Sequence, residues 1–189
     1  MALLTSLYLC SRTVYAAVGT PTGSGARVVA AAQTELPEGC LINGVITNEA
    51  DLTAALKEFF TANKLPMNHV ALIAGGSQFM HRILTLPART RVDTVLATRV
   101  EQSVIAGYDA LAKAVGFKLY SIDLGLAAPI KAVRTIPDLQ QKTFVLLQFD
   151  DDTISACLFV QGQYTYSTRS RLFNPRGSAE SGTEIAQKL

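Results

Sequence analysis

The stretch Leu147-Gln-Phe-Asp-Asp-Asp-Thr-Ile-Ser-Ala-Cys-Leu158 repeats the frame of Leu7-Tyr-Leu-Cys-Ser-Arg-Thr-Val-Tyr-Ala-Ala-Val18. Each stretch contains two apolar residues separated by one residue, then a three-residue break, a threonine, a β-branched residue and, two positions later, an alanine. A glycine-containing turn and a third predicted strand follow both. Apolar runs separated by short polar breaks predict strands joined by tight turns. The sequence therefore predicts a duplicated β-meander with a helix-containing segment between the copies.

The segment between the copies has both helical and strand patterns. Residues 48–63 have apolar residues at helical spacing, Asn48 as a candidate cap and Pro66 just beyond the end. The same reasoning predicts one unbroken helix from Arg91 to Gly116. The remaining predicted elements are strands at 70–74, 79–86 and 117–124 and a short helix or turn at 127–134.

Composition and charge exclude several classes of protein. The 189 residues are 49% hydrophobic and 17% charged, which is typical of a globular protein with a packed core. The net charge is +2, and the basic residues are scattered apart from a loose group at Arg169, Arg171 and Arg176, so we expect no nucleic-acid partner. No segment has the run of roughly 18 apolar residues that a membrane span needs. We therefore expect a soluble protein without direct membrane insertion.

The residues that most often bind metals are poorly placed for that role. Cys10, Cys40 and Cys157 form no CxxC pair and lie in apolar surroundings, which favours reduced, buried thiols. His69 and His81 lack nearby carboxylates at metal-ligand spacing, so we expect ordinary histidines. The sequence predicts no metal site from these residues.

Three further segments are informative: Gly44-Val-Ile-Thr-Asn-Glu-Ala-Asp-Leu52, Arg82-Ile-Leu-Thr-Leu-Pro87, and Tyr108-Asp-Ala-Leu-Ala-Lys-Ala-Val-Gly-Phe117 followed by Ile122-Asp123. They resemble segments of the type IV pilus assembly protein PilM family. Proteins of this family are actin-like and related to the cell-division protein FtsA. Together with the two repeat frames, the resemblance spans most of the chain.

This resemblance implies an α/β, actin-like (ribonuclease H-like) fold with a small α+β inserted subdomain. We expect a first subdomain over residues 1–76 completed by 124–142, an insert over 77–123, and the start of a second actin-like half over 143–189. In the family a strand-containing segment separates two helices of the insert, whereas here Gln102 is followed directly by Ser103. We therefore expect either a reduced insert or a missing segment, and we expect the adenine-binding part of the second half to be absent.

Actin-like phosphate loops carry an Asp and a Gly two residues apart. The Asp holds the water shell of magnesium or the attacking water, and the Gly lets the backbone approach phosphate. By resemblance, these positions fall on Tyr8 and Cys10 in the first loop and on Gln148 and Asp150 in the second, and a basic residue usual in the first loop falls on Tyr15. Because these positions are altered, we predict no catalytic residue and expect no cofactor.

The acidic run Asp150–Asp152 has three interpretations: a metal site, a phosphate site or a solvated turn. Two like charges about 4 Å apart repel by about 1 kcal/mol in water and by more in a lower dielectric, which disfavours phosphate. Alternating side-chain directions disfavour a shared metal ion. The sequence therefore favours a solvated hairpin turn.

The resemblance predicts a non-catalytic scaffold of a type IV pilus or competence pilus complex. Such a scaffold is cytoplasmic and peripheral to the inner membrane, and it binds the tail of a PilN-like membrane protein. By resemblance, the tail binds in a groove between the first subdomain and the insert, which Arg82, Leu84 and Leu86 line. The alternative is that both leucines are core strand residues. Self-association is a further option.

Two alternative functions stay open. The first is an ATP-binding switch or ATPase, in which ATP and magnesium are bound and Ser11, Thr13 and Thr153 donate hydroxyl groups to phosphate. The second is a cell-division scaffold similar to FtsA, which requires an amphipathic C-terminal membrane helix.

Overall fold

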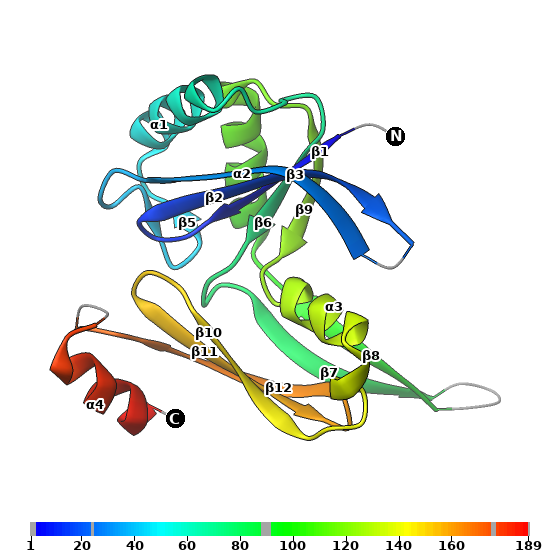
Figure 1. Ribbon diagram of the computed structural model, residues 1–189. Helices are drawn as coiled ribbons and strands as arrows, with labels where there is room; N and C mark the ends of the chain where they lie inside the picture. Colours follow the sequence, from blue (N-terminus) through cyan, green and yellow to red (C-terminus); the bar gives the residue numbers. More distant parts are fainter. Residues whose placement is uncertain (1–2, 24, 88–91, 175–176, 189) are drawn as a thin grey trace. The chain divides into compact units, whose positions relative to one another are not determined.

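The computed structural model describes residues 3–23, 25–87, 92–174 and 177–188 and divides the chain into two compact units (Figure 1). The first unit comprises Met1–Met80 and Arg99–Pro129, and the second comprises His81–Thr98 and Ile130–Leu189. Each unit contains one of the two predicted meanders.

The first unit is built on a five-stranded sheet in the order β3-β2-β1-β6-β9. Strands β1 (Leu4–Leu9), β2 (Thr13–Thr22) and β3 (Gly25–Glu35) form the predicted antiparallel meander. Strand β6 (Val70–Ala74) pairs in parallel with β1, and β9 (Leu119–Leu124) pairs in parallel with β6. A small separate sheet pairs β4 (Leu41–Ile42) with β5 (Val45–Ile46).

Helices α1 (Glu49–Ala62) and α2 (Gln102–Val115) supply the other layer of the first unit. Asn48 caps α1 as predicted, because its side-chain oxygen accepts a hydrogen bond from the Asp51 N–H at 3.2 Å. The buried side chains of both helices and of the sheet belong to one hydrophobic core. The most deeply buried large members are Leu7, Val14, Leu52, Leu56, Phe60, Val70, Leu72, Tyr108 and Leu111.

A close backbone contact joins the β4–β5 hairpin to the end of β6. Gly44 and Gly76 have φ angles of +82° and +129°, which non-glycine residues rarely adopt. A Cβ atom on Gly44 would collide with the Gly75 carbonyl oxygen. The Gly44 carbonyl also accepts a 2.9 Å hydrogen bond from the buried Tyr108 hydroxyl. The Gly75-Gly76 pair therefore directly follows the end of β6 and lies in close contact with the β4–β5 hairpin.

The second unit contains the second meander in the order β10-β11-β12. Its strands are β10 (Phe144–Phe149), β11 (Thr153–Val160) and β12 (Gln163–Arg171), all antiparallel. Before the meander come α3 (Ala127–Thr135) and a 3-10 turn (Pro137–Leu139). Residues 127–134 thus form a helix, as predicted.

Helix α4 (Ala179–Lys188) follows the second meander and is fastened by one carboxylate. Glu184 accepts hydrogen bonds from the backbone N–H groups of Phe173 and Asn174 and from the Asn174 side chain. These bonds lower the pKa of Glu184, because they stabilise its charged form. The end of β12 and α4 are thereby held together.

The single helix predicted from Arg91 to Gly116 is wrong in its first half. Residues Val92–Arg99 form strand β8, which pairs with β7 (Met80–Pro87) in a two-stranded sheet, and α2 begins only at Gln102. The segment is rich in Val and Thr, whose β-branched side chains favour strands. Arg91 itself lies outside the described residues.

The stretch expected as an insert, 77–123, is divided between the two units. His81–Thr98, which includes most of the β7–β8 hairpin, belongs to the second unit. Helix α2 contributes to the core of the first unit, and β9 belongs to its sheet. The part of 77–123 that falls outside the first unit is therefore His81–Thr98.

Candidate functional site

The two meanders present their first turns with the same backbone geometry. In the first, the Cys10 N–H donates to the Thr13 carbonyl at 2.9 Å, and in the second the Asp150 N–H donates to the Thr153 carbonyl at 3.0 Å. The residue after each third strand also bonds to its turn. Leu36 N–H donates to Arg12 and Leu172 N–H to Asp152, both at 2.7 Å. The structure thus contains the pair of matched hairpins that the repeated sequence frame predicts.

Two arginines of β12 form ion pairs with carboxylates of the β10–β11 turn, the first turn of the second meander. Arg169 Nη2 lies 3.5 Å from Asp150 Oδ2, and Arg171 Nε lies 3.3 Å from Asp152 Oδ2. The Asp150 side chain is only 8% exposed, so its charge is largely removed from water. The predicted hairpin turn is confirmed, but the description "solvated" needs correction because Asp150 and Asp152 are ion-paired. Alternate residues of a strand face the same side, which is why both arginines reach the turn.

Arg169 also forms a hydrogen bond with Thr153, whose hydroxyl group contacts phosphate in the ATP-binding alternative. Its Nη2 donates a 2.9 Å hydrogen bond to Thr153 Oγ1, and Thr153 is buried. Asp150 further accepts a 3.4 Å hydrogen bond from Gln148 Nε2. A phosphate approaching Thr153 would therefore meet a buried hydroxyl that already accepts a hydrogen bond and lies beside the acidic turn. Among the described residues, no group of three or more His, Cys, Asp or Glu side chains is arranged to hold a metal ion.

Two tyrosines flank the first hairpin. Tyr8 on β1 and Tyr15 on β2 are directly opposite in the ladder, with ring centroids 6.4 Å apart and an angle of 26° between the planes. By the resemblance to the PilM family, Tyr8 stands at the position of the loop's Asp and Tyr15 at the position of its basic residue. Ser11 and Thr13 are both half-buried, Ser11 within the turn and Thr13 at the start of β2. The first hairpin therefore combines two hydroxyl groups with aromatic rings.

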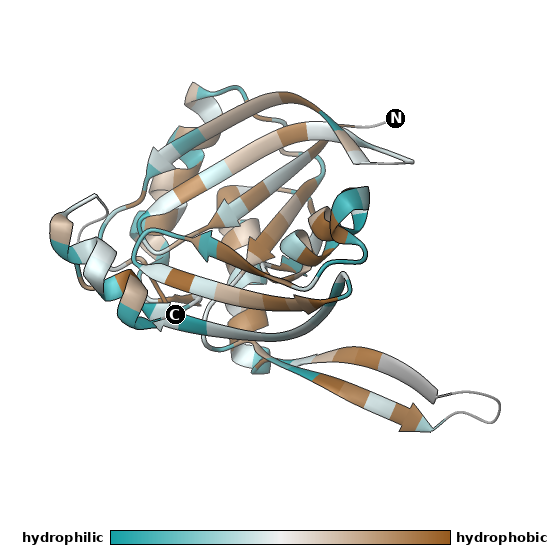
Figure 2. Cartoon of the chain, turned by 60° about the horizontal axis from the view of Figure 1, so that its bottom comes forward, coloured by the Kyte–Doolittle hydropathy of each residue, from teal (hydrophilic) through white to brown (hydrophobic). Residues whose placement is uncertain are grey.

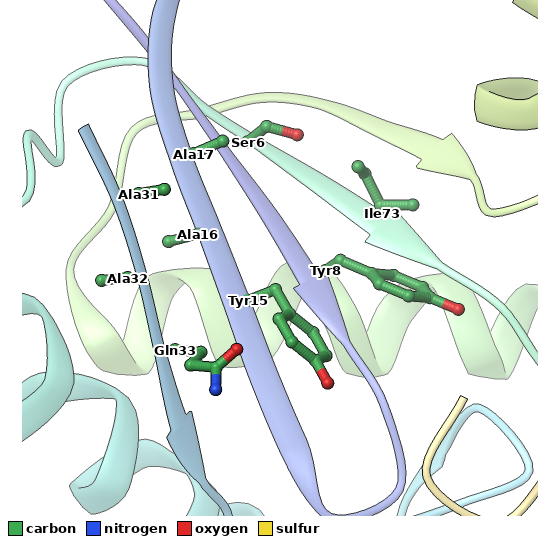
Figure 3. Close-up of a pocket in the computed structure, with 9 residues that line it drawn as sticks. All are labelled: Ser6, Tyr8, Tyr15, Ala16, Ala17, Ala31, Ala32, Gln33 and Ile73. Atoms are coloured by element: carbon green, nitrogen blue, oxygen red, sulfur yellow. The ribbon is translucent and has the colours of Figure 1, made fainter. Parts of the chain in front are cut away.

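The two rings form one wall of a pocket on the five-stranded sheet (Figure 3). Its volume is about 560 Å³. Figure 3 shows alanines from β2 and β3 beside the rings, with the Gln33 amide directed toward Tyr15. The lining residues are Ser6, Tyr8, Tyr15, Ala16, Ala17, Ala31, Ala32, Gln33 and Ile73. This pocket was not predicted from the sequence.

The three residues predicted to bind a partner lie on β7. Leu84 and Leu86 are 38% and 47% exposed and Arg82 is exposed, so the alternative that these leucines are core residues is wrong. Leu96 on β8 is also exposed, and Figure 2 shows apolar residues on both strands of the hairpin. His81 Nδ1 lies 2.9 Å from Thr98 Oγ1 across the hairpin, and burial lowers the pKa of this histidine.

The three cysteines are free thiols and all are buried, as predicted. Burial raises the pKa of Cys40 and of Cys157, which favours their protonated form. Their reactivity in the folded protein is therefore low.

Comparison with solved structures identifies the fold. A chain of a "PilM-PilN type IV pilus biogenesis complex" matches 100% of this chain with a TM-score of 0.74 and 15% sequence identity. This chain has an actin-like fold. The ethanolamine utilization protein EutJ from Carboxydothermus hydrogenoformans matches 100% of the chain with a TM-score of 0.62 and 10% identity. MreB5 of Spiroplasma citri, bound to AMPPNP, matches 90% with a TM-score of 0.51 and 16% identity.

The actin-like chain described here is shorter than these proteins. It spans 65% of the PilM–PilN chain, 57% of EutJ and 53% of MreB5. No protein-family model and no curated protein matches the sequence. Within the described residues, no helix is long and apolar enough to cross a membrane.

Proposed function

We propose that this actin-like chain is a non-catalytic scaffold of a type IV pilus or competence pilus assembly complex. In this role it binds the cytoplasmic tail of a PilN-like protein and lies peripherally at the inner membrane. The observation that carries the non-catalytic part is the Arg169–Thr153 hydrogen bond beside Asp150. The hydroxyl that would contact phosphate is bonded within the protein, and the turn around it is acidic.

The β7–β8 hairpin supports the binding part of the proposal. A two-stranded hairpin by itself is marginally stable in water, so one that exposes several large apolar side chains gains stability from a partner. Leu84 and Leu86 alternate with Thr85 along β7, and Arg82 supplies a positive charge near one end. This arrangement suits an extended, partly apolar peptide with an acidic group. The similarity in fold to a chain from a PilM–PilN complex supports a PilN-like tail as that peptide.

Fluorescence anisotropy with a labelled PilN-like tail peptide tests the binding part. We expect saturable binding to the intact chain, and we expect Leu86→Glu to weaken it. Val28→Glu is the matched control, because Val28 is an exposed apolar strand residue on β3 in the other unit. Absence of binding up to high micromolar protein would contradict the scaffold proposal.

An ATP-binding switch is the second candidate. The half-buried hydroxyl groups of Ser11 and Thr13 at the first hairpin favour it, as does the resemblance in fold to a nucleotide-bound MreB5. An ATP-binding switch binds magnesium-ATP, whereas we expect the scaffold not to bind it, so a binding measurement distinguishes the two candidates. An FtsA-like cell-division scaffold stays a further proposal, which a search for a membrane-binding helix in the full-length gene product would test.

A further inference from the structure

The two-residue turn of the β4–β5 hairpin contains a dipeptide with chemistry of its own. Asn43 and Gly44 lie between the paired residues Ile42 and Val45 and have φ angles of +51° and +82°. Positive φ at both central positions is the mark of a type I′ turn, for which Asn-Gly is a preferred sequence. Among the asparagines of the chain, Asn43 alone is followed by glycine.

An asparagine that precedes glycine can lose its side-chain amide without an enzyme. The Gly44 backbone nitrogen attacks the side-chain carbonyl carbon of Asn43, and the new C–N bond closes a five-membered cyclic imide. The side-chain nitrogen leaves as ammonia and takes the backbone proton with it. Water then opens one of the two carbonyl–nitrogen bonds of the imide, which gives either aspartate or β-linked aspartate. Glycine favours the attack because no Cβ stands beside the nitrogen.

The fold holds the peptide unit that would have to move. Ring closure requires the unit between Asn43 and Gly44 to rotate about the ψ angle of Asn43, which the type I′ turn fixes. A Cβ atom on Gly76 would collide with the Asn43 carbonyl group and lie 2.8 Å from the Gly44 nitrogen, so the backbone of Gly76 packs directly on this unit. The Gly44 carbonyl also accepts the hydrogen bond from the buried Tyr108 hydroxyl at 2.9 Å.

We propose that Asn43 is a site of spontaneous deamidation and that local opening of the β4–β5 turn controls its rate. While the turn is packed on Gly76 and bonded to Tyr108, the Gly44 nitrogen stays away from the side-chain carbonyl carbon. The strands β4 and β5 have only two residues each, and a small two-stranded hairpin is marginally stable by itself. The turn therefore opens without unfolding of the five-stranded sheet, and the peptide unit then rotates freely.

The two products should differ in how they fit the turn. An ordinary aspartate keeps the length of the backbone, and Asp-Gly is itself a preferred type I′ sequence. A β-linked aspartate adds one methylene group to the main chain, so the turn no longer matches the close contact with Gly76. We expect Asn43→Asp to have the thermal stability of the parent chain and the purified β-linked form to unfold at a lower temperature. A β-linked form as stable as Asn43→Asp would contradict the proposed control by the packed turn.

Peptide mapping of the intact chain during incubation in mildly alkaline buffer tests the site. Trypsin cleaves after Arg27 and Lys57, so one peptide contains both Asn43 and Asn48, and its fragmentation distinguishes the two. Asn48 is the internal control, because it is followed by glutamate and its side chain is bonded to Asp51. We expect deamidation at Asn43 and not at Asn48. We also expect the rate to be at least about tenfold higher in the urea-unfolded chain, where nothing holds the turn closed.

Tyr108→Phe tests whether opening of the turn controls the rate. Loss of the hydrogen bond to Gly44 should raise the rate in the folded chain by about fivefold, because the opening equilibrium shifts by the contribution of one hydrogen bond. Arg169→Gln is the matched control, since Arg169 lies in the second unit and its loss should leave the rate unchanged. Circular dichroism establishes that both variants are folded. Equal rates in the folded and unfolded chains, equal rates in the two variants, or no reaction at Asn43 in urea overturns the proposal.

Discussion

Arg169 and Asp150 form an ion pair across the first turn of the second meander, with Nη2 and Oδ2 3.5 Å apart. The same guanidinium group holds the Thr153 hydroxyl. In the ATP-binding alternative the Thr153 hydroxyl contacts phosphate, and here it accepts a hydrogen bond from Arg169. The ion pair balances part of the charge of the acidic turn and supports the proposal that the chain binds no nucleotide there.

Replacing Arg169 tests the energetic part of this finding. We expect Arg169→Gln to lower the free energy of unfolding by about 1–3 kcal/mol, because it leaves the nearly buried Asp150 carboxylate without its charged partner. Arg171→Gln is the matched control. The Arg171 side chain is 63% exposed, so its pair with Asp152 is screened by solvent and its loss costs less than about 1 kcal/mol. Urea unfolding of the two variants measures the difference, and equal effects would contradict it.

Asp150→Asn added to Arg169→Gln should restore part of the lost stability. The neutral amide no longer needs a compensating positive charge, although it keeps its hydrogen-bonding capacity. A double variant less stable than Arg169→Gln alone would show that Asp150 has another, more important partner.

Tyr108 should make folding stability depend on pH in the alkaline range. Burial raises the pKa of its phenol above the ordinary value of 10.0, so the folded protein keeps a proton that the unfolded chain loses. The contribution of Tyr108 is therefore complete below about pH 10 and is lost as pH rises above that value. Tyr108→Phe removes this dependence, together with about 1 kcal/mol from the hydrogen bond to Gly44. Unfolding curves between neutral pH and pH 11 for both proteins measure it; identical pH profiles would be inconsistent with the burial.

The contact between the β4–β5 hairpin and the end of β6 predicts a difference between two glycines. Gly39 and Gly44 have similar φ angles of +77° and +82°, but a Cβ on Gly39 meets nothing within 4 Å. Gly39→Ala should cost about 1 kcal/mol from backbone strain alone. Gly44→Ala should cost about 3 kcal/mol or more, because the methyl group also collides with the backbone at Gly75. Thermal unfolding compares the two, and a Gly44→Ala protein as stable as Gly39→Ala would refute the contact.

Much of this fold follows from local sequence signals. The apolar runs and the threonine after each break predicted both meanders. Asn48 predicted the start of α1, because a cap and the N–H group that it accepts from are close in sequence. The boundary between β8 and α2 has no capping signal of this kind in the sequence. Its N-cap residue is Glu101, whose side chain makes no capping hydrogen bond, and the apolar positions of β8 continue nearly in phase with those of α2.

The site was harder to predict, because its contacts join residues that are distant in sequence. The signal for the ion pairs was present in Arg169 and Arg171, two basic residues with the alternating spacing of one strand face. It could be interpreted only once β12 was placed next to the acidic turn by the β11 register. The Tyr8–Tyr15 pair similarly required the β1–β2 register.

The central proposal is that this actin-like chain binds no nucleotide at its two hairpin turns. Isothermal titration with magnesium-ATP tests it most directly. The account predicts no saturable heat of binding up to millimolar nucleotide for the intact chain. Micromolar affinity that falls on Ser11→Ala or Thr13→Ala would contradict it.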